Sequence, residues 1–172
     1  PSSQSFCILL CIGVLFIDLL SENITVFFAS DRYLEASYLV FPLCMAFAVK
    51  SLGGITNIGI SLSKKTYFYL ISYLCSITIF FISFFYLIPL YGSLAIAYSI
   101  LISQIVKAVI STFIAQFVYP ISWDYKPLII IPSITLIIGL VTNYGDIEND
   151  LRIFLNAAFL FFLSFYFMFS LN

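Results

Sequence analysis

The fold is decided by residues 64–118, which read KKTYFYLISYLCSITIFFISFFYLIPLYGSLAIAYSILISQIVKAVISTFIAQFV. Two long apolar runs, Thr66 to Ile88 and Leu94 to Val118, are joined here by Pro89-Leu90-Tyr91-Gly92-Ser93. As a helix, the first run spans about 34 Å, against roughly 30 Å of bilayer hydrocarbon. The second run contains a single charge, Lys107, near its middle. The pattern predicts a transmembrane hairpin.

The composition of the whole chain agrees with this prediction. Of its 172 residues, 63% are hydrophobic and 9% are charged, and the mean hydropathy is +1.14. Soluble domains carry roughly a quarter charged residues. The net charge is -1, and the few charges lie at the ends of apolar runs or singly within them, so no basic face for nucleic acid is formed. We therefore predict an integral membrane protein without a nucleic-acid partner.

We predict an all-α fold, a polytopic transmembrane helical bundle that forms a single domain over residues 1–172. Asp18 lies near the end of the first apolar run. Two interpretations of that run stay open, because Ser21-Glu22-Asn23 either ends it at the interface or marks a kink in a helix that continues to Ala29. Because the chain begins at Pro1 and not at Met, we expect a fragment of a longer transporter. The six expected helices cover about residues 6–20, 33–60, 66–88, 94–118, 127–141 and 151–171.

The second expected helix has a polar and glycine-rich face. Its members recur at steps of three and four residues, so that one face of a helix would collect them. For the glycines alone, close helix packing is an equally good explanation. For the lysine it is not, because a charge facing lipid costs at least ~2.5 kcal/mol. The face consists of Lys50, Gly53, Gly54, Asn57 and Ser61.

The fourth expected helix carries a second polar stripe, with Lys107 at its centre. Its five members fall within an arc of about 140°. One interpretation is structural, with interhelical hydrogen bonds and with Lys107 neutralised by Asp18 or by a carbonyl group. The other is functional, with the lysine as a cationic contact for an anionic substrate. The stripe consists of Ser99, Ser103, Gln104, Lys107 and Ser111.

Enzymatic chemistry has no support in this sequence. It contains no histidine, no intramembrane carboxylate pair and no glycine-rich phosphate loop preceded by a strand. The cysteines all lie in apolar runs, and without histidine they do not suggest a metal site. We expect neither catalysis, nor a metal, nor a cofactor.

The expected loops alternate in charge. Three lysines lie in the loops around residues 63–65 and 122–126, while the loops near Tyr91 and Glu148 are neutral or acidic. By the positive-inside rule the lysine loops, and with them both ends of the chain, are cytoplasmic. Tyr91 and Glu148 are then expected on the opposite, periplasmic side.

The hairpin resembles that of Wzx-type O-antigen flippases, in the multidrug/oligosaccharidyl-lipid/polysaccharide exporter superfamily. The resemblance rests on Lys64-Lys65-Thr66, on the segment from Leu87 to Ala97 that reads LIPLYGSLAIA, and on Tyr33-Leu34-Glu35-Ala36. It covers roughly Asp18 to Tyr125. Members often have a Gly-Ala-Ala cluster where this chain has Ser93-Leu94-Ala95-Ile96-Ala97. They typically carry twelve to fourteen helices, so the resemblance implies that these six are the C-terminal half.

The resemblance implies a function, the transfer of an undecaprenyl-pyrophosphate-linked oligosaccharide across the bacterial inner membrane by alternating access. In such a transporter Lys107 and Lys50 would contact the pyrophosphate, and Gln104 and Asn57 the sugar hydroxyls. Asp18 is the candidate for ion coupling. The expected partners are the lipid-linked oligosaccharide, membrane lipid, the missing N-terminal half and the polysaccharide polymerase machinery. A cation-coupled multidrug exporter is the alternative, but it would need acidic groups in its cavity.

Overall fold

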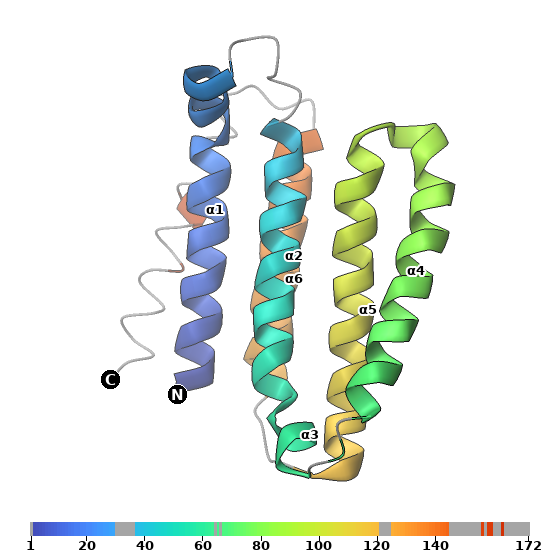
Figure 1. Ribbon diagram of the computed structural model, residues 1–172. Coiled ribbons are helices and arrows are strands. Elements are labelled where there is room, and N and C mark those ends of the chain that lie inside the picture. The colour runs from blue at the N-terminus through green and yellow to red at the C-terminus, as the bar shows by residue number, and fades with distance from the viewer. Residues whose placement is uncertain are drawn as a thin grey trace. The chain divides into compact units, whose positions relative to one another are not determined.

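A computed structural model describes residues 2–29, 37–63, 65, 67–120 and 125–144, together with residues 156, 158, 159 and 163. These residues contain helices and no strand, as the all-α prediction requires (Figure 1). The six helices that can be bounded within them are α1 (Ser2–Ala29), α2 (Ser37–Thr56), α3 (Ile58–Leu62), α4 (Tyr67–Tyr91), α5 (Leu94–Val118) and α6 (Tyr125–Tyr144).

Four of these helices are long and apolar enough to cross a membrane. They are α2, α4, α5 and the part of α1 from Gln4 to Ser21. With 25 residues each, α4 and α5 extend about 37 Å, which exceeds the hydrocarbon thickness. The apolar part of α6, Leu128–Thr142, falls below that length. The described residues therefore form an α-helical membrane protein with four candidate spans, while the sixth span that the sequence predicted, over 151–171, lies largely outside them.

The other expected helices differ in detail from those observed. The helix expected over 33–60 is divided at Asn57 into α2 and α3. The first helix does not stop at residue 20 but continues to Ala29, as one of the two interpretations allowed. Only Asn156, Ala158, Phe159 and Leu163 of the helix expected over 151–171 belong to the described residues, so its bounds stay a prediction.

The turn of the hairpin is shorter than predicted. Pro89 lies inside α4, and only Gly92 and Ser93 separate α4 from α5. Gly92 adopts a positive φ of 55°, which a residue without Cβ accepts most easily, and its N–H donates to the Ile88 carbonyl at 3.0 Å. Because this bond satisfies a carbonyl of the final turn, the helix extends past the proline before the chain reverses.

The chain divides into two compact units, residues 1–45 with 125–172, called unit 1 here, and residues 46–124, called unit 2. In unit 1, α1 packs against α6, and Phe41 of α2 lies in the buried core directly against Gly139 of α6. Hydroxyl groups in this core bond back to their own helices, as for Thr135, which donates to the Ile131 carbonyl at 2.9 Å. Its buried cysteines, Cys7 and Cys11, are free thiols.

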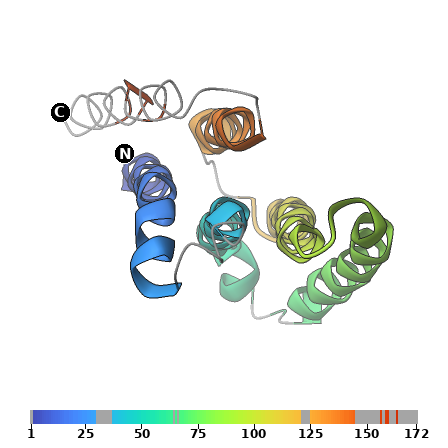
Figure 2. The ribbon, with the colours of Figure 1, turned by 90° about the horizontal axis from the view of Figure 1, so that it is seen from above.

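Unit 2 contains the hairpin of α4 and α5, with α3 and the second part of α2 packed on α5. Seen from above, α5 lies between α2 and α4 (Figure 2). Small residues allow this close packing, since a Cβ on Gly53 would lie 3.5 Å from the Ala108 Cβ. From α4, the Ser76 hydroxyl donates to the Ser103 carbonyl of α5 at 3.1 Å. Most large side chains of α4 are exposed, as expected for a helix that faces lipid.

Candidate functional site

A cavity of about 210 Å³ opens between α2, α4 and α5, entirely within unit 2. Its lining includes two lysines, Lys50 and Lys107, and two amides, Asn57 and Gln104. These are the four residues that the sequence proposed for substrate contact, and they come from two helices that are far apart in the chain. The structure therefore brings them together at one cavity, while their role there stays a prediction.

The spacing of the polar residues explains this convergence. Lys50, Gly53 and Gly54 follow one face of α2, which Asn57 continues directly after the helix, and Gln104, Lys107, Ala108 and Ser111 follow one face of α5. Gly53 and Ala108 meet where the two faces come together, so the longer polar side chains around them enclose a space.

Not every residue of the predicted polar faces reaches the cavity. Ser103 is buried, and its hydroxyl donates to the Ile100 carbonyl at 2.8 Å. Ser99 is also buried and lies outside the cavity lining. Ser61 belongs to α3, where its hydroxyl is 2.8 Å from that of Tyr69. The hydroxyls of these three serines therefore lie outside the cavity lining.

The two lysines of the cavity contact aromatic rings. Lys107 Nζ lies 3.6 Å from the centroid of the Tyr73 ring, and Lys50 Nζ lies 5.9 Å from that of Phe47. Neither Asp nor Glu is among the residues that line the cavity. The cavity therefore brings together two lysines from candidate spans, with no acidic side chain in its lining.

The two amides leave hydrogen-bond acceptors unused. Asn57 Oδ1 and Gln104 Oε1 are both buried and have no hydrogen-bond partner among the described residues. Asn57 as a whole is only 8% exposed. A buried acceptor without a donor costs about 1–3 kcal/mol. A ligand that brings hydroxyl or N–H groups into the cavity would remove this cost.

The interruption between α2 and α3 also lies at the cavity. Asn57 separates the two helices, and its carbonyl accepts a hydrogen bond from the Tyr69 hydroxyl of α4 at 2.9 Å. One residue earlier, Thr56 Oγ1 lies 2.8 Å from Thr112 Oγ1 of α5. Both neighbouring helices thus hold the interruption in place, and Asn57 projects from a fixed point.

Sequence reasoning missed the two tyrosines that line the cavity from α4, Tyr69 and Tyr73. The sequence does indicate a polar face on this helix. Its members recur at steps of three and four residues in an otherwise apolar run, and they are Tyr69, Ser72, Tyr73 and Ser76. Ser72 and Ser76 are buried. The sequence analysis did not identify this polar face of α4, because tyrosine is counted as hydrophobic and the run therefore reads as uniformly apolar.

The predicted coupling residue, Asp18, belongs to unit 1 and lies within the candidate span Gln4–Ser21. It is buried, and Asn156 Nδ2 donates to its Oδ2 at 3.4 Å, a partner that sequence reasoning did not identify. The Ser21 hydroxyl donates to the Asp18 main-chain carbonyl at 2.7 Å. The alternative in which Asp18 neutralises Lys107 joins residues of different units and stays a prediction.

We expect Tyr69→Phe to lower the thermal stability of the detergent-solubilised protein. The change removes the hydroxyl that bonds to the Asn57 carbonyl and to Ser61, a loss of about 1 kcal/mol. Tyr67→Phe is the matched control, because Tyr67 is exposed and contacts Phe68 through its ring. Equal melting temperatures for Tyr69→Phe and the control would show that the hydroxyl does not hold the helix interruption.

Comparison with known proteins gave no match, whether to protein-family models, to curated proteins or to solved structures. The functional argument therefore depends on the chemistry of the cavity.

Proposed function

We propose that this chain is part of a flippase that carries an undecaprenyl-pyrophosphate-linked oligosaccharide across the bacterial inner membrane. The observation that supports it most directly is the cavity of unit 2, where two lysines and two unpaired amide oxygens meet between candidate membrane spans. The resemblance of the hairpin sequence to Wzx-type flippases supports the same proposal.

The chemistry of the lining matches such a substrate in two ways. A pyrophosphate offers several anionic oxygens to the ammonium groups of Lys50 and Lys107. Sugar hydroxyls are donors as well as acceptors, so they can satisfy Asn57 Oδ1 and Gln104 Oε1. A ligand with both kinds of group balances the charge of the cavity and also pairs its buried acceptors.

The size of the cavity limits what these helices hold by themselves. Its 210 Å³ exceeds the roughly 150 Å³ of a protein cavity that accommodates benzene. One ring-sized group or one phosphate group fits this space, whereas an oligosaccharide does not. We propose that the remainder of a longer transporter completes the cavity, and that the two halves alternate access by a rocking motion.

A cation-coupled multidrug exporter remains the second candidate from the sequence. It would attract cationic drugs through carboxylates in its cavity, but the lining of the observed cavity contains lysines and no acidic side chain among the described residues. The charge of the cavity therefore favours the flippase.

We propose that Asp18, which is buried in a candidate span, couples transport to H⁺ or Na⁺.

The proposed orientation places Lys65 and both ends of the chain in the cytoplasm and Tyr91 in the periplasm, from the distribution of lysines. Phosphatase fusions measure this directly, because the reporter is active only after export. We expect a fusion after Tyr91 to be active and one after Lys65 to be inactive. Activity at Lys65 would reverse the orientation.

We expect Lys107→Ala in the full-length protein to abolish or strongly reduce surface polysaccharide without lowering protein abundance. The substitution removes one of the two cationic contacts for the pyrophosphate. Lys107→Arg should retain part of the activity, since it keeps the charge. Surface polysaccharide and membrane abundance are measured together in a strain that lacks the native gene.

The matched control is Lys65→Ala, which removes the same charge from an exposed position outside the cavity. It should leave the polysaccharide at its normal level. Normal polysaccharide in the Lys107→Ala strain would refute the proposed role. A loss of abundance that Asp18→Asn restores would instead support the structural pairing of Asp18 with Lys107.

A further inference from the structure

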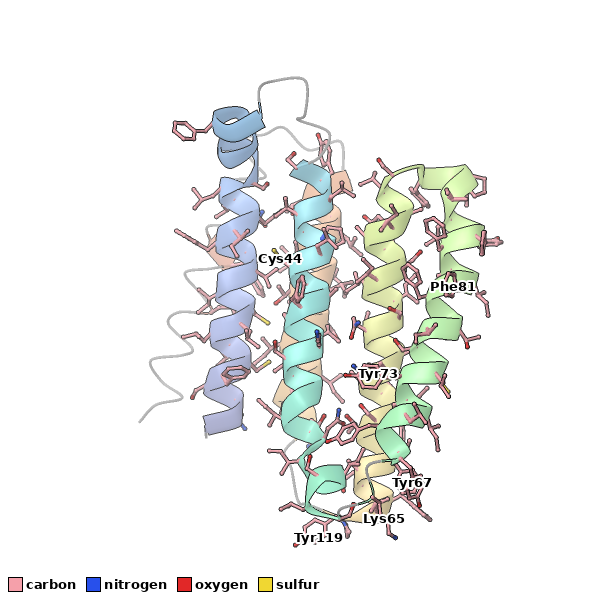
Figure 3. The ribbon with its side chains drawn as sticks, viewed as in Figure 1. Cys44, Lys65, Tyr67, Tyr73, Phe81 and Tyr119 are labelled. Carbon is pink, nitrogen blue, oxygen red and sulfur yellow. The ribbon has the colours of Figure 1, made fainter. Side chains whose placement is uncertain are left out.

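The Lys107 ammonium group contacts the face of a tyrosine ring. Tyr73 projects from α4 toward α5 (Figure 3), and its ring centroid lies 3.6 Å from Lys107 Nζ. Cation–π attraction acts within about 6 Å of the centroid, so this contact is well inside the range. The contact of Lys50 with Phe47, at 5.9 Å, is at its limit. The two lysines of the cavity therefore differ in how firmly an aromatic ring holds them.

The position of Lys107 along α5 explains why it needs a nearby partner. It is more than ten residues from both ends of the 25-residue helix, a distance of at least about 16 Å. A lysine side chain near a helix end can extend its charge to the interface, but one at this depth cannot. The ammonium group must therefore be stabilised where it is.

The contact with Tyr73 leaves the lysine able to bind an anion. The ring covers one side of the ammonium group, which has three N–H donors in all. Tyr73 and Lys107 both belong to the cavity lining. An anion in the cavity can thus reach the ammonium from the side that the ring does not cover, and neither residue has to move away from the other.

We infer that Tyr73 is a positioning residue of the anion site, whose ring holds the Lys107 ammonium group at the cavity wall before an anion binds. The inference rests on the proposed function, in which the cavity receives the pyrophosphate group. A cation that is already held in place loses less conformational freedom on binding, so the affinity for the anion is higher. The inference assigns this role to the face of the ring.

The test is the affinity of the full-length protein in detergent for inorganic pyrophosphate, measured by calorimetry. Tyr73→Leu removes the aromatic face and should weaken binding about tenfold. Tyr73→Phe keeps the face and should bind within about twofold of the unchanged protein. Tyr86→Leu is the matched control, since Tyr86 is an exposed tyrosine of α4 outside the cavity lining and its loss should not change the affinity.

A double substitution separates positioning from a general effect on the fold. In a Lys107→Ala background, Tyr73→Leu should change the affinity by less than about twofold, because the group that the ring positions is absent. A tenfold loss in this background would contradict the inference, and so would unaltered affinity of the Tyr73→Leu single variant.

Three further cases complete the test. If Tyr73→Leu is poorly produced, Tyr73→Trp replaces it, because indole offers the strongest face for a cation. This variant should bind at least as tightly as Tyr73→Phe, and weaker binding would overturn the inference. If the unchanged protein binds no pyrophosphate, the anion site itself fails, and the proposed function fails with it. Normal pyrophosphate binding that is indifferent to the ring would leave the proposed function intact and reject only the role of Tyr73.

Discussion

A lysine ammonium group near the middle of a membrane-spanning helix must be stabilised by its surroundings, because a charge facing hydrocarbon costs at least ~2.5 kcal/mol. Lys107 of α5 is such a group, and much of unit 2 is arranged around it. The Tyr73 ring lies over it, and the cavity beside it is bounded by polar groups of α2 and α5. Small residues such as Gly53 and Ala108 keep the helices close enough for these side chains to share one space.

The cavity combines features that are costly in a membrane protein unless a ligand uses them. Two lysines share a wall whose lining contains no carboxylate, and the amide oxygens of Asn57 and Gln104 lack donors among the described residues. The interruption of the α2–α3 segment lies at the same place. There the Asn57 carbonyl accepts hydrogen bonds from the Tyr69 hydroxyl and from the Ile60 N–H.

The sequence was sufficient to predict the helical membrane fold and the exact limits of α5, because long apolar runs and the turn at Gly92 are local signals. It was also sufficient to place Lys50, Asn57, Gln104 and Lys107 on helix faces, from which the structure brings them to one cavity. Four of the six expected crossings are candidate spans, the apolar part of α6 is shorter than these, and the sixth crossing lies largely outside the described residues.

Tertiary contacts account for what the sequence left open. The interruption at Asn57 is held by hydrogen bonds from α4 and α5, which no local pattern in α2 reveals. The contact between Tyr73 and Lys107 joins two helices, and the ring could equally have faced lipid. Likewise, the hydrogen bond between Asp18 and Asn156 links residues from opposite ends of the chain.

The central claim is that a water-accessible cavity with a positive potential lies between α2, α4 and α5. Its most direct test is the rate at which small thiol reagents of opposite charge modify Ala108→Cys, after the four native cysteines are replaced. Ala108 lines the cavity, whereas Phe85, the control position, is exposed on α4 outside it. The account predicts that the anionic reagent modifies Ala108→Cys faster than the cationic one, that pyrophosphate slows this reaction, and that Phe85→Cys reacts with neither. Equal rates for the two reagents, or a faster cationic reagent at Ala108→Cys, would contradict it.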